Sequence, residues 1–172
     1  MKILVLNAGS SSQKSFLYEL GDSLPELAPK PLWEAQIDWT IFPGSAELRL
    51  KISDGSEIKE QTTVESRSAA IKHMLERLWS GPAQAIGSPA EIDVVGHRVV
   101  HGGHSYQEAI LVTPEVRAEI ERLAVFAPLH NRADLEGMEC VDQIVGPVRQ
   151  IAVFDTAFQP FARSRVRLSW PL

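Results

Sequence analysis

Cysteine is nearly absent from this sequence, which has Cys140 as its single example among 172 residues. One cysteine excludes an intramolecular disulfide and the cysteine-based zinc spacings. Such a count suits a reducing compartment, and we expect a cytoplasmic location. The apolar run near the N-terminus ends at Leu6, which is too short for a signal-peptide core or a membrane span, so we expect no membrane partner.

Basic runs are also missing. The formal net charge is -5 and the sequence pI is near 5.5, so the electrostatic surface that a nucleic-acid-binding protein requires is not predicted. Hydrophobic residues make up 44% of the chain and charged residues 23%, a balance typical of soluble globular proteins and not of disordered chains. A chain of this length can bury a core as one domain without covalent staples.

Hydrophobic periodicity predicts strands first and then helices that alternate with strands. We expect strands at residues 2–6, 15–20, 32–39, 46–52, 57–64, 92–95 and 150–154. We expect helices at residues 66–79, 113–126 and 135–145. Asp54-Gly55 is a pair favoured in hairpin turns, and Thr113 followed by Pro114 is typical of a helix N-terminus. This order predicts one α/β domain built on a mixed sheet.

The first strand runs into the segment Asn7-Ala-Gly-Ser-Ser-Ser-Gln-Lys14. A glycine turn frees backbone N–H groups, and these groups together with three hydroxyls and a lysine suit phosphate oxygens. The spacing of a P-loop is absent. A plain hairpin connection is the alternative interpretation of this segment.

A second segment of the same kind, Gly96-His-Arg-Val-Val-His-Gly-Gly103, follows the expected strand at 92–95. The guanidinium of Arg98, beside glycines that allow close approach, is suited to grip a carboxylate or phosphate through two parallel bonds. The alternative is an alternating strand in which Arg98 and His97 face solvent or cap a neighbouring carbonyl. His101 is open to a purely structural role.

Two further segments carry polar residues after apolar elements. Asp155 directly follows the last expected strand, where its carboxylate is suited to hold a metal ion or to accept a hydrogen bond from a reacting group, or to form an ordinary turn or helix cap. His130 lies in Pro128-Leu-His-Asn131, which we expect to be a loop between two helices, with Asn131 as a candidate helix cap.

These four segments, in this order, closely resemble the N-terminal motifs of acetate kinases. The resemblance covers residues 1–158 and implies the N-terminal domain of an actin-like ATPase, an α/β fold with a ribonuclease-H-like mixed sheet flanked by helices. Residues 159–172 no longer follow the family, and the second, nucleotide-binding domain is absent from the sequence. Gln13 and Gln159 also depart from the leucine and histidine that are usual in the family.

The resemblance implies that the cofactors are ATP or ADP and Mg2+. It places Asn7 at the magnesium-associated position. It also places Ser10, Ser12 and Lys14 on the first phosphate-facing turn.

The acceptor implied by the resemblance is a small carboxylate, acetate. Arg98 matches the arginine that grips the carboxylate, and Val100 and Leu129 match positions that line the pocket for the acetate methyl group. His130 matches a histidine close to the transferred phosphoryl group, and Asp155 matches the active-site acid.

The implied activity is phosphoryl transfer between ATP and acetate, with this chain incomplete by itself, and full-length family members are expected to be homodimers. A propionate kinase with a different pocket volume around Val100 and Leu129 is an alternative. A folded non-catalytic remnant or interaction module from a truncated gene is a second one.

Overall fold

A mixed sheet organises the computed structural model, which describes residues 1–23, 25–42, 44–63, 65–103 and 105–157. Its eight strands lie in the order β5-β4-β3-β2-β1-β6-β8-β7. In chain order the strands are β1 (Lys2–Ala8), β2 (Ser12–Glu19), β3 (Trp33–Phe42), β4 (Ser45–Ile52), β5 (Glu57–Thr63), β6 (Val94–Val99), β7 (Ile110–Leu111) and β8 (Arg149–Phe154). β1, β6 and β8 are parallel neighbours and the other pairings are antiparallel, so the expected mixed α/β sheet is confirmed.

The first five strands form an antiparallel meander, and its last connection contains the expected hairpin turn. Gly55 has a φ of +90°, a backbone conformation that glycine adopts without steric cost. The Asp54 carboxylate accepts a hydrogen bond from the Ser56 amide at 2.7 Å. The β4–β5 hairpin is therefore confirmed, although four residues, 53–56, connect the two strands.

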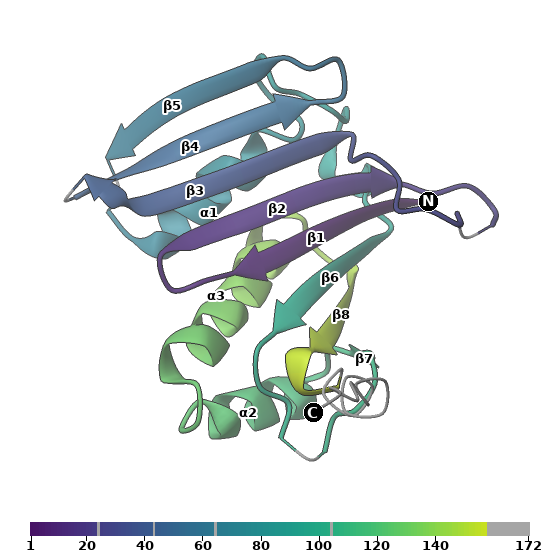
Figure 1. The fold of residues 1–172 in the computed structure, drawn as a ribbon, viewed down its shortest axis with the longest axis vertical. Coiled ribbons are helices and arrows are strands. Elements are labelled where there is room, and N and C mark those ends of the chain that lie inside the picture. The colour runs from purple at the N-terminus through teal and green to yellow at the C-terminus, as the bar shows by residue number, and fades with distance from the viewer. Residues whose placement is uncertain (24, 43, 64, 104, 158–172) are drawn as a thin grey trace, which may run out of the picture.

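Helices α1 (Arg67–Glu76), α2 (Pro114–Leu123) and α3 (Pro128–Ile144) pack on the same face of the sheet, and Figure 1 shows α1 behind β2 and β3. Alternate residues of the strands point toward these helices; Leu4 and Leu17 are fully buried there. A core of mainly aliphatic side chains, together with the fully buried Trp33, joins β1–β4 to α1 and α3. A smaller cluster joins β6 and β8 to α2 and α3. None of the helices in the described ranges has the length and apolar character that a bilayer span requires.

The helix starts follow the predicted capping signal at one place and differ from the expectation at another. Thr113 is the N-cap of α2, and its hydroxyl accepts from the Val116 amide at 3.3 Å, as expected. The expected loop at residues 128–131 is wrong, because α3 begins at Pro128. Proline is favoured at the first helical position, and here it follows Ala127, a residue without a capping side chain.

Several strand bounds also differ from the expectation. β2 begins at Ser12, because Lys14 and Gln13 pair with Asn7 and Ala8 of β1. β6 runs through the Gly96-His-Arg motif to Val99, since β1 and β8 pair with it on both sides. The two-residue strand β7 was not predicted. Residues 158–172, which include the expected tail, lie outside the described residues.

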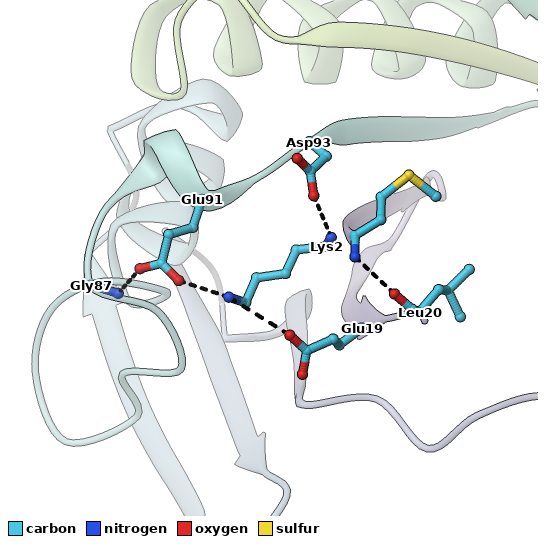
Figure 2. A network of polar contacts seen from close by, with 7 residues as sticks. Lys2, Glu19, Leu20, Gly87, Glu91 and Asp93 are labelled. Atoms are coloured by element: carbon cyan, nitrogen blue, oxygen red, sulfur yellow. Dashed lines mark hydrogen bonds and ion pairs between the residues drawn. The ribbon is translucent and has the colours of Figure 1, made fainter. Parts of the chain in front are cut away.

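A polar network fixes the register of β1 at the end of the sheet far from Asn7 (Figure 2). The Lys2 ammonium bonds to Glu91 Oε2 at 2.8 Å and lies 3.9 Å from Glu19 Oε1. The Lys2 backbone amide donates to Asp93 Oδ2 at 2.6 Å. These contacts tie β1 to its neighbours on both sides, and the same register places Asn7 beside Arg98 at the other end.

Candidate functional site

Strand register brings three of the predicted site residues into one row. Asn7 of β1 lies opposite Lys14 of β2 and opposite Arg98 of β6, so the three side chains emerge on the same face of the sheet. This face is the one that the three helices leave open. The Asn7 side-chain oxygen accepts a hydrogen bond from Arg98 Nη1 at 2.9 Å.

The Arg98 guanidinium is held by both carboxylate oxygens of Asp155. Its Nε donates to Oδ1 at 2.8 Å and its Nη2 donates to Oδ2 at 2.6 Å. This two-bond contact, together with the negative charge of Asp155, raises the pKa of Arg98 above its ordinary value. The Arg98 side chain remains 48% exposed to solvent, although both donors of its fork are occupied by Asp155.

The turn between β1 and β2 is closed by a backbone hydrogen bond from the Gly9 amide to the Ser12 carbonyl at 2.8 Å. A Cβ atom at Gly9 would lie 2.9 Å from the Ser12 oxygen, so the tight turn requires glycine. Ser10 is exposed and Ser12 half-buried at the start of β2. The predicted phosphate-facing residues of the turn therefore lie at the same edge of the sheet as Asn7.

Val100 follows β6, and its amide is bonded to a buried carboxyl group. The Val100 N–H donates to Asp134 Oδ2 at 3.4 Å, and the Asp134 side chain is 2% exposed. Burial raises the pKa of Asp134 to about 7, because desolvation and the nearby Asp155 charge outweigh the Val100 bond and the charges of Arg98 and Arg67. Asp134 therefore joins α3 to the segment that carries the predicted acetate-pocket residue Val100.

Leu129 and His130 lie on the first turn of α3, not on a loop. Leu129 is 70% exposed, while His130 has a buried Nδ1 atom that finds no hydrogen-bond partner among the described residues. Asn131, the candidate cap, is instead buried, and it donates to the His101 and Ile120 carbonyls at 3.1 Å each. Across the described part of the chain, no hydrogen bond joins His130 to Arg98.

The histidines on either side of Arg98 have structural partners. His97 is buried on the helix-covered face, where Nε2 lies 2.7 Å from Gln150 Oε1, and burial lowers its pKa to about 4. Gln150 donates in turn to Asp142 Oδ1 at 2.5 Å. The solvent-facing alternative is therefore wrong for His97. His101 accepts from the Gly103 amide at 3.1 Å, which supports its structural role.

The candidate oxygen donors for a metal ion are those of Asn7 and Asp155, which in this structure accept hydrogen bonds from Arg98. No group of three or more His, Cys, Asp or Glu side chains with the spacing of a metal site occurs in the described ranges. Mg2+ usually takes one or two protein oxygens and completes its shell with water and substrate phosphates. The carboxylate and amide oxygens beside Arg98 fit that donor set.

Two residues of the site were missed by sequence reasoning, Arg67 and Asp134. Arg67 Nη2 donates to the Gly9 carbonyl at 2.6 Å across 58 positions of sequence, and Asp134 is bonded to an amide 34 positions away. Arg67 is the first residue of α1, and Asp134 lies on the buried face of α3 with Met138 and Val141. A buried acid within an amphipathic helix, such as Asp134 beside Leu135, is the one local signal that was available.

Comparisons with known proteins show which family this chain resembles in sequence and fold. The model of the acetokinase family matches residues 2–165. The acetate kinases of Cyanothece sp. and Gloeobacter violaceus are 54% and 53% identical, each matching 92% of this chain, and the chain spans 39% of each relative's length. The crystal structure of Porphyromonas gingivalis acetate kinase superposes with a TM-score of 0.80 at 36% identity, covering 91% of this chain and 38% of that one. A propionate kinase structure from Francisella tularensis gives a TM-score of 0.75 at 30% identity, with 91% and 37% covered. The chain belongs to the acetokinase family.

Proposed function

We propose that this chain forms one side of the active site of an acetate kinase, which transfers a phosphoryl group between ATP and acetate. The observation that carries the proposal is the Arg98 guanidinium, whose fork is already set in two-bond geometry against a carboxylate. Asn7 and the Gly9–Ser12 turn lie at the same edge of the sheet. A carboxylate grip beside a phosphate-binding turn suits phosphoryl transfer, which depends on in-line positioning and on neutralising phosphate charge.

In this proposal, acetate takes the place of the Asp155 oxygens on Arg98. Acetate is ionised at neutral pH, so it needs orientation and no general base. Val100 and the exposed Leu129 supply apolar surface for its methyl group. In this proposal the side chains of His130, Lys14, Ser10 and Ser12 face the phosphate groups.

Asn7 and Asp155 are the residues that would hold Mg2+. When bound, the ion neutralises charge on the phosphate oxygens. Release of Asp155 from Arg98 frees carboxylate oxygens for that role and frees the guanidinium for the substrate. In this proposal, one movement of the Asp155 side chain exposes the binding groups for both Mg2+ and the substrate carboxylate.

The proposal extends to the organisation of the chain. Residues 1–158 form the acetate-kinase-like domain, residues 159–172 form a divergent tail, and the location is cytoplasmic. Full-length members are proposed to be homodimers. The relatives are more than twice as long as the matched segment, so we propose that these 172 residues alone do not reach ordinary kinase turnover.

The test is equilibrium binding of acetate to the chain, followed by NMR of the backbone amides. Acetate is expected to shift the Arg98 and Val100 amides in the wild type. The Arg98→Lys variant keeps the charge but loses the fork, and it should bind about tenfold more weakly. Equal binding by the two proteins would remove the main support for the proposal. ADP formation from ATP and acetate, measured by a coupled assay, tests the expected lack of turnover.

A propionate kinase is the second candidate, favoured by the structural similarity to the Francisella tularensis propionate kinase. Leu129 is 70% exposed, and in this second candidate it would contact the longer acyl chain. Dissociation constants for acetate, propionate and butyrate separate the two candidates. An acetate kinase site should bind acetate at least as tightly as propionate.

A further inference from the structure

Arg67, the first residue of α1, donates hydrogen bonds to the Gly9–Ser12 turn. The proposed function assigns phosphate binding to this turn. The Arg67 guanidinium donates through Nη2 to the Gly9 carbonyl at 2.6 Å and through Nη1 to the Ser10 carbonyl at 3.4 Å. Ser66, the residue before Arg67, is the N-cap of α1, and its hydroxyl accepts from the Ala69 amide at 3.1 Å. The start of α1 is therefore fixed, and Arg67 reaches the turn from a rigid element.

Trp39 of β3 completes the support of the turn. Its ring lies under the Arg67 guanidinium, with Cζ 4.7 Å from the ring centroid, a cation–π contact. Its backbone amide donates to the Ser11 carbonyl at 3.2 Å. Arg67 Nε also lies 3.6 Å from Glu136 Oε2 of α3. The guanidinium plane is thus constrained on several sides.

These contacts decide where the turn's N–H groups point. In a trans peptide unit the carbonyl and the following N–H are directed to opposite sides of the same plane. The carbonyls of Gly9, Ser10 and Ser11 are all directed at protein donors. The N–H groups of Ser10, Ser11 and Ser12 are therefore turned away from Arg67 and Trp39.

The groups that face outward are free to bind a ligand. Among the residues that the structure describes, the Ser10 and Ser11 amides and the hydroxyls of Ser10, Ser11 and Ser12 make no hydrogen bond. Successive free N–H groups in a turn form a concave site that suits an anion. The outward set of donors matches what phosphate oxygens require.

We propose that Arg67 is a positioning residue for phosphate binding. Its guanidinium does not contact the phosphate. It is stacked on Trp39 and binds the Gly9 and Ser10 carbonyls, so the amides of the Gly9–Ser12 turn point the other way and are preorganised to bind phosphate oxygens. The inference rests on the proposed phosphate-binding role of the turn. It adds a residue that acts from the opposite side of that turn.

The experiment uses the 172-residue chain with inorganic tripolyphosphate as the probe. Arg67→Gln removes the charge and the fork, whereas Arg67→Lys keeps the charge and loses the two-carbonyl geometry. Arg77→Gln is the matched control, because Arg77 ends the same helix region in an ion pair with Glu60 at 3.3 Å. Two readouts are collected by NMR: tripolyphosphate-induced shifts of the Ser10–Ser12 amides, and hydrogen exchange of the Gly9 amide.

For Arg67→Gln we expect tripolyphosphate binding to weaken by about tenfold and Gly9 exchange to accelerate by a similar factor, since charged hydrogen bonds are lost. Arg67→Lys should fall between Arg67→Gln and the wild type, and its retained charge keeps the test valid if Arg67→Gln folds poorly. Arg77→Gln should match the wild type in both readouts.

The possible contrary results are distinct. If Arg67→Gln and Arg67→Lys bind tripolyphosphate as the wild type does, the positioning role is overturned and the phosphate-binding role of the turn stands. If the wild type shows no shift at Ser10–Ser12, the phosphate-binding role fails. If, in addition, the Gly9 amide exchanges at the wild-type rate in the Arg67 variants, Arg67 does not stabilise the turn either.

Discussion

Arg98 on β6 and Asp155 after β8 form a two-bond ion pair, with Nε–Oδ1 and Nη2–Oδ2 distances of 2.8 and 2.6 Å. The pair occupies the donors that the proposed function assigns to the substrate carboxylate. In the proposed function, Asp155 therefore competes with acetate for Arg98. Binding of acetate must include the free energy of separating this pair, which lies partly in solvent.

Replacing Asp155 by asparagine is expected to tighten acetate binding. The amide carries no charge and has one acceptor oxygen, so the Arg98 fork becomes available. We expect the dissociation constant for acetate to fall by roughly tenfold, measured by titration of backbone amides. Asp155→Asn should at the same time weaken Mg2+ binding, because a proposed oxygen ligand is lost.

Glu119→Gln is the matched control for this variant. Glu119 holds Arg122 of α2 through two bonds of 2.7 and 2.6 Å, so the change removes the same charge from the same kind of pair elsewhere. Its acetate affinity should equal that of the wild type. Equal or weaker acetate binding by Asp155→Asn would show that Asp155 does not compete for Arg98.

Asp134→Asn is expected to change the pH dependence of stability. The folded pKa of Asp134, about 7, lies above the value of about 3.9 for an unfolded aspartate. The unfolded chain therefore ionises first as the pH rises, and the free energy of unfolding of the wild type falls between about pH 4 and pH 7. The variant lacks this loss, so its stability relative to the wild type should rise across that window, on the order of a few kcal/mol.

Urea unfolding at several pH values measures this difference. His97, with a folded pKa of about 4, contributes in the opposite sense, because it loses stability as the pH falls. His97 is present in both proteins, so subtracting the wild-type curve from the variant curve isolates Asp134. Parallel curves from pH 4 to 8 would contradict a raised Asp134 pKa. The carboxyl carbon of Asp134 should also titrate near pH 7 by NMR.

Local signals in the sequence were sufficient for much of the fold. Thr113-Pro114 predicted the start of α2, and Asp54-Gly55 predicted the β4–β5 hairpin. Both signals act within a few residues, because a hydroxyl caps the next turn and a glycine admits a positive φ. The Arg98 and Asp155 motifs were identified because each was expected to follow an apolar strand, although Arg98 lies within β6.

The strand bounds, the helix start and the site residues that were not predicted depend on contacts with residues far away in the sequence. Lys14 belongs to β2 because it pairs with Asn7, and His130 belongs to α3 because the helix starts without a capping side chain. Arg67 and Asp134 become part of the site only when α1 and α3 pack beside the β1 turn and the end of β6. The element against which a helix packs is not encoded by the local spacing of its residues.

Ser66→Ala should destabilise the chain by about 1 kcal/mol, because the Ser66 hydroxyl accepts from the Ala69 amide at the start of α1. The measurement is the midpoint of urea unfolding at unchanged slope. Ser88→Ala is the matched control, since Ser88 precedes a short 3-10 helix, Pro89–Glu91, without a side-chain capping bond. Similar losses for the two variants would argue against a specific cap at Ser66.

Gly102→Ala tests the packing beneath the Arg98–Asp155 pair. A Cβ atom at this position would lie 2.6 Å from Phe154 Cγ, and Phe154 is fully buried and stacked on Tyr106. The ring has no room to retreat, so we expect a loss of about 1–3 kcal/mol in the free energy of unfolding. Displacing Phe154 also moves Asp155, its neighbour in sequence.

Gly96→Ala provides the comparison, because a Cβ atom at Gly96 would meet no atom within 4 Å. Gly96 belongs to β6, six residues earlier in the same motif, so the two variants share chemistry and sequence context. We expect Gly96→Ala to retain wild-type stability within about 0.5 kcal/mol. Acetate affinity should also drop in Gly102→Ala alone, because only that substitution disturbs the strand end that carries Asp155. Equal stability of the two variants would mean that the Phe154 ring is free to repack, and the link between Gly102 and the site would fail.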